Sequence, residues 1–512
     1  MLRYLLPANL LLASLAGAQV ATILPFAASS DLLVGDSNGG RILRITANTL
    51  ESGSPQISVY FDPVSAIDIT TGQPYGAILG TPAAITSDLS GRIFIAAQTT
   101  FPRVFRLVDL NNDGDAQDSG ESTVFVDGSQ ISNFSNSTAN GIAVDPNGTA
   151  WVTSDAATGD WVYKFTDIDN NGNANDAGEI VEFYNDGTYT ANGGSPLFNV
   201  AWAGFTPSGK FYMTNAASFH QFVVTLDDVS NNGTANDFSD VSTISLIGKC
   251  RCARFGRDGR LYMFNTTTKV LVASNDQNNN SYYSDPGETV TFAQSSVSTA
   301  LLQTGQIFDI RADGAVVFGD TGASAKLVIW KDNNQNGVAT DPADTTISVS
   351  FAGTAFPNAQ PRSVFFLPVE PAQFGTACNN STGFPGILSW DRDGGLPKPG
   401  NLNFSLDVDQ APPGSLVGVM YSGSDTSISF DSLLPGLSDP ACLLYLDIFD
   451  AEFNTVEPLQ SADANGHVTI PIALPQSVAA LAGLTFYLQA LVYDPSAALP
   501  ITLTNGVALP LL

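Results

Sequence analysis

The chain has 512 residues, of which 44% are apolar and only 13% charged, and this length predicts roughly two to four domains. Its 49 acidic residues against 20 basic ones give a formal net charge of −29. This balance argues against binding nucleic acid by phosphate neutralisation and against docking on anionic lipid, and it suits a protein that holds cations. Only two histidines occur, so His-rich zinc, copper or iron sites are nearly excluded.

Residues 1–18 have the pattern of a secretory signal peptide. Arg3 supplies a positive start, residues 10–15 form a short apolar core, and Ala-Gly-Ala gives a small-x-small cleavage site before Gln19. The alternative is a buried first strand or helix. No later stretch has the ~18 uninterrupted apolar residues of a membrane-spanning helix. We therefore expect an exported protein without a membrane span, which is secreted, periplasmic or held at the cell surface.

Residues 83–352 repeat a unit of about fifty residues five times. Each unit contains short runs rich in Val, Ile, Phe, Tyr and Thr, bounded by Gly, Asn and Asp, which is typical of β-strands. Four strands per unit at this period predict the blades of a β-propeller.

A sixth blade is divided between the two ends of the repeat region. Residues 31–37, 41–47 and 57–62 supply three strand-like runs, and residues 362–368 supply the missing inner strand. Pairing the two ends would close the ring and leave no unpaired strand edge. The sequence therefore predicts an all-β chain with a six-bladed propeller over residues 19–372.

The corners of the repeat carry the pattern D-x-x-G-x-Φ-Φ-V, where Φ is apolar, followed by an aliphatic strand. Over about residues 25–370 this pattern resembles the NHL-repeat and gluconolactonase-like six-bladed propellers. The resemblance implies the fold. Gluconolactonase-like enzymes hold a metal in the channel with a Glu and Asn/Asp set, and that set is not matched residue by residue in this sequence.

A thirteen-residue acidic phrase follows the third strand of each complete unit. It begins at Asp109, Asp167, Asp228, Asp276 and Asp332, so successive copies start 58, 61, 48 and 56 residues apart. In every copy an oxygen-bearing side chain occupies positions 1, 3, 5, 10 and 13, and position 6 is Gly in all copies but one. Positions 1, 3, 5 and 6 match the opening of an EF-hand loop.

This spacing predicts calcium binding. Ca²⁺ takes about six to eight oxygen ligands, and alternate residues of a tight loop can direct their side chains at one centre. Position 7 would contribute its backbone carbonyl, which explains why its side chain varies freely. The later acids fall at 10 and 13 rather than 9 and 12, and strands rather than helices flank the loop. The alternative is an Asn- and Asp-rich turn without metal.

We expect about five Ca²⁺ ions in all. The expected ligands are Asp109, Asn111, Asp113, Asp118 and Glu121; Asp167, Asp169, Asn171, Asp176 and Glu179; Asp228, Ser230, Asn232, Asp237 and Asp240; Asp276, Asn278, Asn280, Asp285 and Glu288; and Asp332, Asn334, Asn336, Asp341 and Asp344. The first two loops have the most carboxylates and should bind tightest. Because the loops lie on outer hairpins, away from the second turns around the channel, we expect a structural role for them.

No nucleophile is paired with a base along the second turns of the repeat, where a propeller enzyme would carry its site. His220 is a base, a metal ligand or simply a polar residue at a turn. Cys250 and Cys252 lie two apart on an inner strand, where packing competes with a soft-metal or redox role.

Two further groups of side chains leave alternatives open. The only basic cluster would bind an anionic ligand near the channel or pair with local acids; it comprises Arg251, Arg254, Arg257 and Arg260. Four tryptophans on strands or strand ends would form platforms for sugars or pack between blades; they are Trp151, Trp161, Trp202 and Trp330.

Residues 373–512 form a second predicted domain. Alternating apolar runs indicate β-strands, and a β-sandwich is the natural fold. Cys378 and Cys442 are expected to form a disulfide. The phrases TFYLQALVYDP and LTNGVAL resemble a C-terminal module of large secreted proteins of planctomycete-type bacteria, which implies attachment, sorting or matrix contact.

Three functions remain open from the sequence. The first is a secreted calcium-binding propeller that binds a protein or glycan partner, or the cell surface or matrix, without catalysis. The second is a hydrolase or lactonase-like enzyme with a separate central metal, and the third is a carbohydrate-binding protein. A central cation with acidic and amide ligands would favour the enzyme, and a flat aromatic strip would favour sugar binding.

Overall fold

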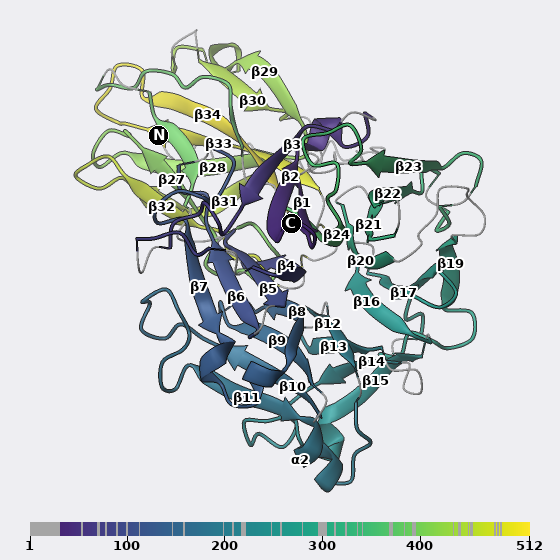
Figure 1. Cartoon of the computed structure of the whole chain (residues 1–512). Coiled ribbons are helices and arrows are strands. Elements are labelled where there is room, and N and C mark those ends of the chain that lie inside the picture. Colours follow the sequence, from purple (N-terminus) through teal and green to yellow (C-terminus); the bar gives the residue numbers. More distant parts are fainter. Residues whose placement is uncertain are drawn as a thin grey trace. The chain divides into compact units, whose positions relative to one another are not determined.

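The computed structural model of the chain describes residues 31–511 apart from short internal segments (Figure 1). These segments are 53–54, 69–71, 77–78, 89–90, 99–100, 112, 146, 157–158, 198, 207–208, 217–221, 247, 257–258, 279, 295–304, 312–313, 323–324, 335, 340, 368–371, 383–384, 392–395, 434, 439–441, 449, 451–453, 476–477, 479–480 and 482–483. The expected signal peptide, His220 and Arg257 therefore lie outside the described residues. The chain divides into two compact units, one within residues 28–369 and the other within 370–475 and 481–512.

The first unit consists of six four-stranded antiparallel sheets, which we number as blades. Blade 1 contains β24 (Pro361–Phe366), β1 (Leu32–Asp36), β2 (Arg41–Ile45) and β3 (Ile57–Phe61). Blade 2 contains β4 (Thr81–Ser87), β5 (Ile93–Gln98), β6 (Arg103–Leu107) and β7 (Ser122–Asp127). Blade 3 contains β8 (Thr138–Val144), β9 (Ala150–Ala156), β10 (Gly159–Phe165) and β11 (Ile180–Asn185).

The remaining blades follow the same order from the inner strand outward. Blade 4 contains β12 (Val200–Phe205), β13 (Phe211–Asn215), β14 (Phe222–Leu226) and β15 (Val241–Leu246). Blade 5 contains β16 (Cys250–Phe255), β17 (Leu261–Asn265), β18 (Val270–Ser274) and β19 (Thr289–Gln294). Blade 6 contains β20 (Gly305–Ile310), β21 (Val316–Asp320), β22 (Lys326–Lys331) and β23 (Thr345–Ser350).

The innermost strands form a closed ring. Each contacts the innermost strand of the next blade, in the order β24, β4, β8, β12, β16, β20 and back to β24. The unit is therefore a six-bladed β-propeller, as the sequence predicts. The ring closes inside blade 1, where β24 pairs with β1 in the register Leu33↔Phe365. In Figure 1 the green β24 accordingly lies beside the purple β1.

The core lies between neighbouring blades. Successive side chains of a strand point to opposite faces, so a strand with a blade on each side needs apolar residues at every position. All five residues of β1 are buried. Leu32 and Val34 pack in the cluster shared with blade 6, whereas Leu33 packs in the cluster shared with blade 2.

Helical turns are few and short in the part of the chain that the structure describes. They are η2 (Ala47–Thr49), η3 (Gly128–Gln130), η4 (Phe134–Asn136), α2 (Asp186–Ala191) and η5 (Phe238–Asp240) in the propeller and η6 (Phe430–Ser432) in the second unit. Across the described residues, no helix has the length and apolarity needed to cross a membrane.

The second unit is also built from strands. A five-stranded sheet contains β25 (Ala372–Phe374), β34 (Ile501–Pro510), β33 (Thr485–Tyr493), β28 (Leu416–Ser422) and β31 (Asn454–Ser461). Two smaller sheets contain β26 (Ile387–Trp390), β27 (Ser405–Asp409) and β32 (Val468–Pro471), and β29 (Asp425–Ser429) and β30 (Leu443–Leu446). The arrangement of these sheets as a sandwich and the predicted domain bounds remain predictions.

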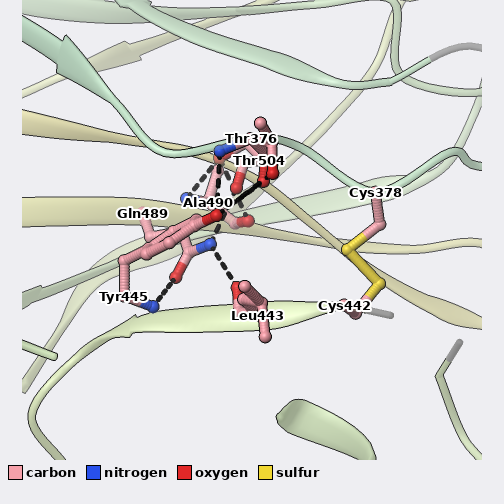
Figure 2. The surroundings of a disulfide bond; sticks show 8 residues. All are labelled: Thr376, Cys378, Cys442, Leu443, Tyr445, Gln489, Ala490 and Thr504. Carbon is pink, nitrogen blue, oxygen red and sulfur yellow. Dashed lines mark hydrogen bonds between the residues drawn. A yellow bond between two sulfur atoms is a disulfide. The ribbon is translucent and has the colours of Figure 1, made fainter. Parts of the chain in front are cut away.

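The expected disulfide is present and joins Cys378 to Cys442 (Figure 2). Beside it, the fully buried Gln489 on β33 connects two sheets. Its amide nitrogen donates to the carbonyls of Leu443 (3.0 Å) and Thr504 (2.7 Å), and its oxygen accepts from the Tyr445 N–H (2.9 Å). The side chain thus ties β30 to β33 and β34.

Candidate metal loops and the central channel

Each acidic phrase forms the loop between the third and fourth strands of its blade. The five loops join β6 to β7, β10 to β11, β14 to β15, β18 to β19 and β22 to β23. In an up-and-down sheet this turn lies on the face opposite to the starts of the inner strands. All the expected ligands therefore lie on outer hairpins of blades 2 to 6.

The carboxylate at position 13 braces the loop from inside. In the first loop Glu121 is 2% exposed, and its two oxygens accept the backbone N–H groups of Leu110 (2.9 Å) and Asp118 (3.1 Å). The equivalent pair of bonds, to positions 2 and 10, recurs at Glu179, Asp240, Glu288 and Asp344. These two hydrogen bonds close the loop in the absence of any cation.

Position 6 makes the sharp bend. Its N–H donates to the aspartate at position 1, as from Gly114 to Asp109 (3.0 Å), and its φ is 98°. A positive φ favours glycine because a Cβ would be crowded there. The fourth loop has Ser281 at this position with a φ of 63° and keeps the same bond, to Asp276 (2.8 Å).

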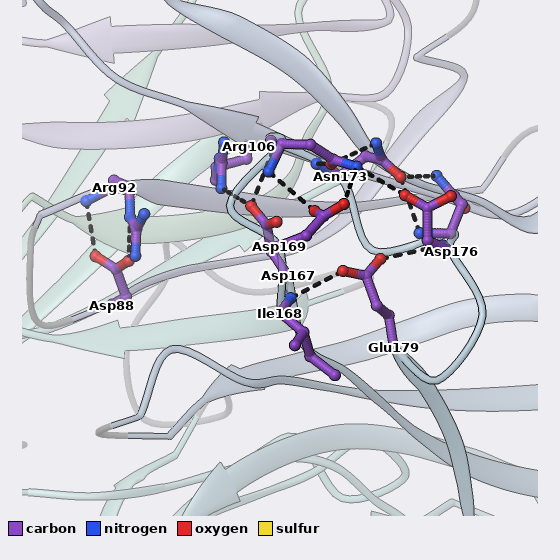
Figure 3. Close-up of polar contacts among 12 residues, drawn as sticks. Asp88, Arg92, Arg106, Asp167, Ile168, Asp169, Asn173, Asp176 and Glu179 are labelled. Carbon is purple, nitrogen blue, oxygen red and sulfur yellow. Dashed lines mark hydrogen bonds and ion pairs between the residues drawn. The ribbon is translucent and has the colours of Figure 1, made fainter.

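The side chains at positions 3, 5 and 10 meet inside the loop. Figure 3 shows the second loop, with Asp169 and Asp176 labelled. The Asn171 amide donates to Asp169 (3.1 Å) and to Asp176 (2.7 Å). An Asn at position 3 or 5 donates to the position-10 aspartate in the other four loops as well. A half-turn of this amide would place its oxygen rather than its NH₂ group among the carboxylates, as a hard cation requires.

The first two loops fit a cation best. Asp109 Oδ1 and Asp167 Oδ1 are buried and have no hydrogen-bond partner among the described residues. In the other three loops this oxygen accepts the N–H of position 5. Asp167, Asp169 and Glu179 form the one group of three acidic side chains in the described chain whose ligand oxygens lie within 4.8 Å of one another. A buried acceptor without a donor is costly, and a bound cation would satisfy it.

An arginine of the preceding blade contacts each of these two loops. Arg44 on β2 donates to the Gly114 carbonyl (2.6 Å), and Arg106 on β6 pairs with Asp167 (3.1 Å). The two arginines occupy the same place in the strand sequences RILRI and RVFRL. The loops are thereby fixed to the neighbouring blade.

A cavity of about 270 Å³ opens at the starts of the inner strands. Its lining residues come from blades 1 to 5, and only the axis of the ring is common to so many blades. They are Gln98, Thr138, Asn140, Asp155, Asn199, Val200, Ala201, Ala216, Lys249, Arg251 and Arg362. The cavity is therefore the mouth of the central channel, on the face opposite to the acidic loops.

Regular β-bulges supply several of these residues. Near its start, each of five inner strands has one residue more than its partner strand, and the extra residue is Ala83 in β4, Asn140 in β8, Ala201 in β12, Arg251 in β16 and Arg362 in β24. All but Ala83 line the cavity. A bulge redirects a side chain out of the ladder pattern, and in four of the blades this irregularity brings one residue to the channel mouth.

A pair of carboxyl groups lies at the edge of the channel. Asp155, which lines the cavity, and the buried Asp160 are directly opposite each other on β9 and β10. Burial, and then the neighbouring Asp155 charge, raise the pKa of Asp160 well above the usual carboxyl range. Burial thus favours the neutral form of Asp160, and Asp155 is the member of this pair that lines the cavity.

The other candidate residues have packing roles where the structure describes them. Cys250 and Cys252 are buried free thiols, and burial raises the pKa of both, so they are not thiolates at neutral pH. Arg254 pairs with Asp309 (3.2 Å) and lies over the Trp202 ring. Of Arg251, Arg254 and Arg260, the members of the basic cluster that the structure describes, Arg251 alone lines the cavity.

The four tryptophans do not form a flat strip. Three of them are buried, namely Trp161, Trp202 and Trp330. Trp151 is partly buried and stacks on Phe211, with the Lys164 ammonium over its ring. These rings pack between blades rather than offering a sugar platform.

The sequence indicated Arg251 as part of a basic cluster that would bind an anion near the channel or pair with local acids, but sequence reasoning missed Arg362. The signal was present in the repeat, because Arg362 and Arg251 occupy equivalent positions near the start of an inner strand. Residue spacing alone does not show that these side chains face the channel, since a bulge changes which residue faces the axis.

No protein-family model and no curated protein matches this chain. Its fold is similar to that of several solved structures of low sequence identity. One is a putative 6-phosphogluconolactonase from Bacteroides uniformis, with 15% identity, a TM-score of 0.38 and coverage of 66% of this chain and 99% of that one. Another is a virginiamycin B lyase from Staphylococcus aureus, with 13% identity, a TM-score of 0.37 and coverage of 68% and 92%.

A gluconolactonase from Xanthomonas campestris is similar at the same level, with 11% identity, a TM-score of 0.36 and coverage of 65% of this chain and 89% of that one. At such identities and TM-scores, the activities of these proteins carry no argument for this chain. The six-bladed architecture rests on its own strand pairing and ring closure.

Proposed function

We propose that this protein is an exported, calcium-stabilised β-propeller that binds a protein or glycan partner outside the cytoplasm. The observation that supports it best is the shared construction of the five acidic loops, with a buried brace at position 13 and unsatisfied buried oxygens at Asp109 and Asp167. The Cys378–Cys442 disulfide is compatible with an oxidising compartment.

In this proposal the side chains at positions 1, 3, 5 and 10 hold the ion, together with the carbonyl of position 7. Calcium would neutralise carboxylates that otherwise repel one another at the tip of each hairpin. The position-13 carboxylate is already bonded to two backbone N–H groups and keeps the loop in shape. The first two loops should bind tightest, since each has three carboxylates at positions 1, 3, 5 and 10 and a buried, unsatisfied oxygen at position 1.

The test is a calcium titration of residues 19–512 with thermal unfolding before and after chelation. We expect about five sites and a large rise in Tm on binding, because a ligand that binds only the folded state stabilises it by mass action. The double variant Asp169→Asn/Asp176→Asn should lose one tight site. The matched control is Asp463→Asn, which makes the same carboxylate-to-amide change in an exposed turn of the second unit.

Failure to bind calcium, or an unchanged site count in the Asp169→Asn/Asp176→Asn variant, would overturn the loop assignment. Loss of a site in the Asp463→Asn control would also contradict it, because that turn lies outside the repeated phrase.

A lactonase-like hydrolase with its own central metal is a second candidate. The observation in its favour is that one carboxylate, Asp155, lines the channel with the amides of Asn140 and Asn199. Lys249 and the two arginines weigh against it, because they give the cavity three cationic side chains around that single carboxylate.

This candidate predicts an extra metal site that disappears in Asp155→Asn, together with hydrolysis of a sugar lactone by the wild-type protein. If the number of bound metal ions is the same in Asp155→Asn as in the wild type, the lactonase-like candidate is ruled out.

A further inference from the structure

We propose that the mouth of the central channel is a binding site for the anionic group, a carboxylate or a phosphate, of a small polar ligand held between Arg251 and Arg362. The site is independent of the five acidic loops, which lie on the opposite face of the propeller.

The first observation is that neither arginine is paired with an acidic side chain of the described residues. Neither guanidinium forms a hydrogen bond or an ion pair with any described residue. Acidic partners are abundant in a chain with 49 acids against 20 bases. Seven other arginines each pair with an Asp or Glu, namely Arg41, Arg44, Arg92, Arg103, Arg106, Arg254 and Arg311.

The second observation is that the two charges are partly buried beside each other. Burial lowers the pKa of Arg251, and burial together with the Arg251 charge lowers the pKa of Arg362 to about 10. Both guanidiniums remain charged at neutral pH. Two like charges in a partly desolvated cavity destabilise the folded protein, and an anion between them would reverse that cost.

The third observation is how the chain places them. Arg251 and Arg362 are the extra residues of equivalent bulges in blades 5 and 1, and both line the cavity. Bulges are common beside functional sites because they re-aim a side chain. Guanidinium groups are well suited to oxyanions, since their planar donors match a carboxylate or phosphate in a bidentate manner.

The rest of the lining suits a polar ligand of modest size. Asn140 is held in place by the Gln98 amide (2.6 Å) and the Val200 carbonyl (2.9 Å). Thr138 and Asn199 add further hydrogen-bonding groups, and the lining includes few apolar side chains. The volume of about 270 Å³ is just below the usual range for small-molecule sites, about 300–1,000 Å³. It therefore admits a small compound and not a folded partner.

Asp155 gives the site a direction. It is the one carboxylate of the lining, and it lies close enough to Arg251 to influence its pKa. It would repel the anionic group and accept hydrogen bonds from hydroxyls. The anion should therefore sit toward Arg362, with hydroxyl groups toward Asp155.

The test uses calorimetric titration and thermal shift of the calcium-loaded full chain at low ionic strength. The probes are D-glucuronate, which joins a carboxylate to hydroxyls, inorganic phosphate, and D-glucose as the uncharged control. We expect at least one anionic probe to bind at a single site with a Kd of about 1 mM or tighter, and added salt to weaken it. Binding of glucuronate identifies a carboxylate ligand, and binding of phosphate alone identifies a phosphate ligand.

The variants Arg251→Gln and Arg362→Gln should each weaken binding about tenfold to a hundredfold, the range for losing a charge-assisted hydrogen bond. Their Tm without probe should equal or exceed the wild-type value, because a repulsion is removed. The control Arg103→Gln changes the same charge on β6, where Arg103 pairs with Asp127 (3.7 Å), and should leave probe binding unchanged.

Absence of binding by both anions, equal binding of D-glucose, or full affinity in both channel variants would overturn the proposal. The number of calcium sites is measured separately in the calcium titration. The same sample therefore distinguishes failure of the anion-site proposal from failure of the calcium assignment.

Discussion

At the residue scale, the acidic side chains of each loop have two different roles: one carboxylate accepts backbone hydrogen bonds, and the others face the interior of the loop. Glu179 is turned inward, and both of its oxygens accept backbone N–H groups, whereas Asp169 and Asp176 share the exposed interior of the loop with Asn171. Hydrogen bonds from backbone N–H groups stabilise the fold directly, while carboxylates that only face one another repel unless a cation is present.

The variants Glu179→Gln and Asp169→Asn should therefore behave differently. Glu179→Gln replaces an acceptor oxygen by an NH₂ group, which leaves one buried N–H unpaired and costs about 1–3 kcal/mol of unfolding free energy with or without calcium. Asp169→Asn should lower stability only when calcium is present. Denaturant unfolding in calcium and in chelator measures both, and an equal response of Glu179→Gln and Asp169→Asn in chelator would contradict the division.

Asp160 makes the stability of the folded protein depend on pH, with a sign opposite to that expected for a salt-bridged carboxylate. Its pKa is raised in the folded state, so the folded protein binds more protons than the unfolded chain above about pH 4. The contribution to stability is full at low pH and is lost as the pH rises from there through the raised folded pKa.

The variant Asp160→Asn mimics the protonated form and removes the like-charge pairing with Asp155. We expect its Tm to exceed that of the wild type by an amount that grows between about pH 5 and 9. A Tm difference that stays constant or shrinks across that range would show that Asp160 is ionised in the fold.

At the element scale, β-bulges in the inner strands determine which side chains reach the channel. The bulge near the start of β8, β12, β16 and β24 brings one residue to the channel mouth, while the regular part of the same strand packs between blades. In the second unit, three hydrogen bonds of Gln489 connect β30, β33 and β34. A buried amide with all these partners fixes the relation of its strands better than an apolar residue of the same size.

Replacement Gln489→Leu keeps the volume but leaves two carbonyls and one N–H group in the core without their partner. We expect a loss of about 1–3 kcal/mol in unfolding free energy. The matched control is Gln460→Leu on the edge strand β31, where the glutamine is partly exposed. Equal effects of Gln489→Leu and Gln460→Leu on chemical unfolding would show that the buried amide adds nothing.

At the scale of the whole molecule, the two units depend on different cross-links. The propeller contains all five acidic loops, whereas the disulfide lies in the second unit. We expect calorimetry to resolve two unfolding transitions. Chelation should lower the Tm of the propeller alone, and reduction of the disulfide should lower the Tm of the second unit alone. Closing a segment of 64 residues by a disulfide is worth about 4 kcal/mol in the chain-entropy account. A single transition that responds to both treatments would show that the units unfold together.

Much of the propeller could be predicted because its information is local and repeated. A strand period of about fifty residues, punctuated by the same acidic phrase, gives both the blade and the number of blades. The pairing of residues 31–37 with 362–368 followed from the need to protect a strand edge, and the register Leu33↔Phe365 confirms it. Calcium in the loops remains a prediction, with the buried oxygens of Asp109 and Asp167 in its favour.

The sequence by itself thus determined the strands, the blade count and the loops, because each depends on spacing within a few dozen residues or on closing an edge. It also predicted the Cys378–Cys442 pair. Only the tertiary structure decided that position 13 faces inward and that Arg251 and Arg362 meet at the channel. Those facts depend on which way a bulge turns a side chain and on which blades face each other across the axis. Such distances arise only when the ring closes.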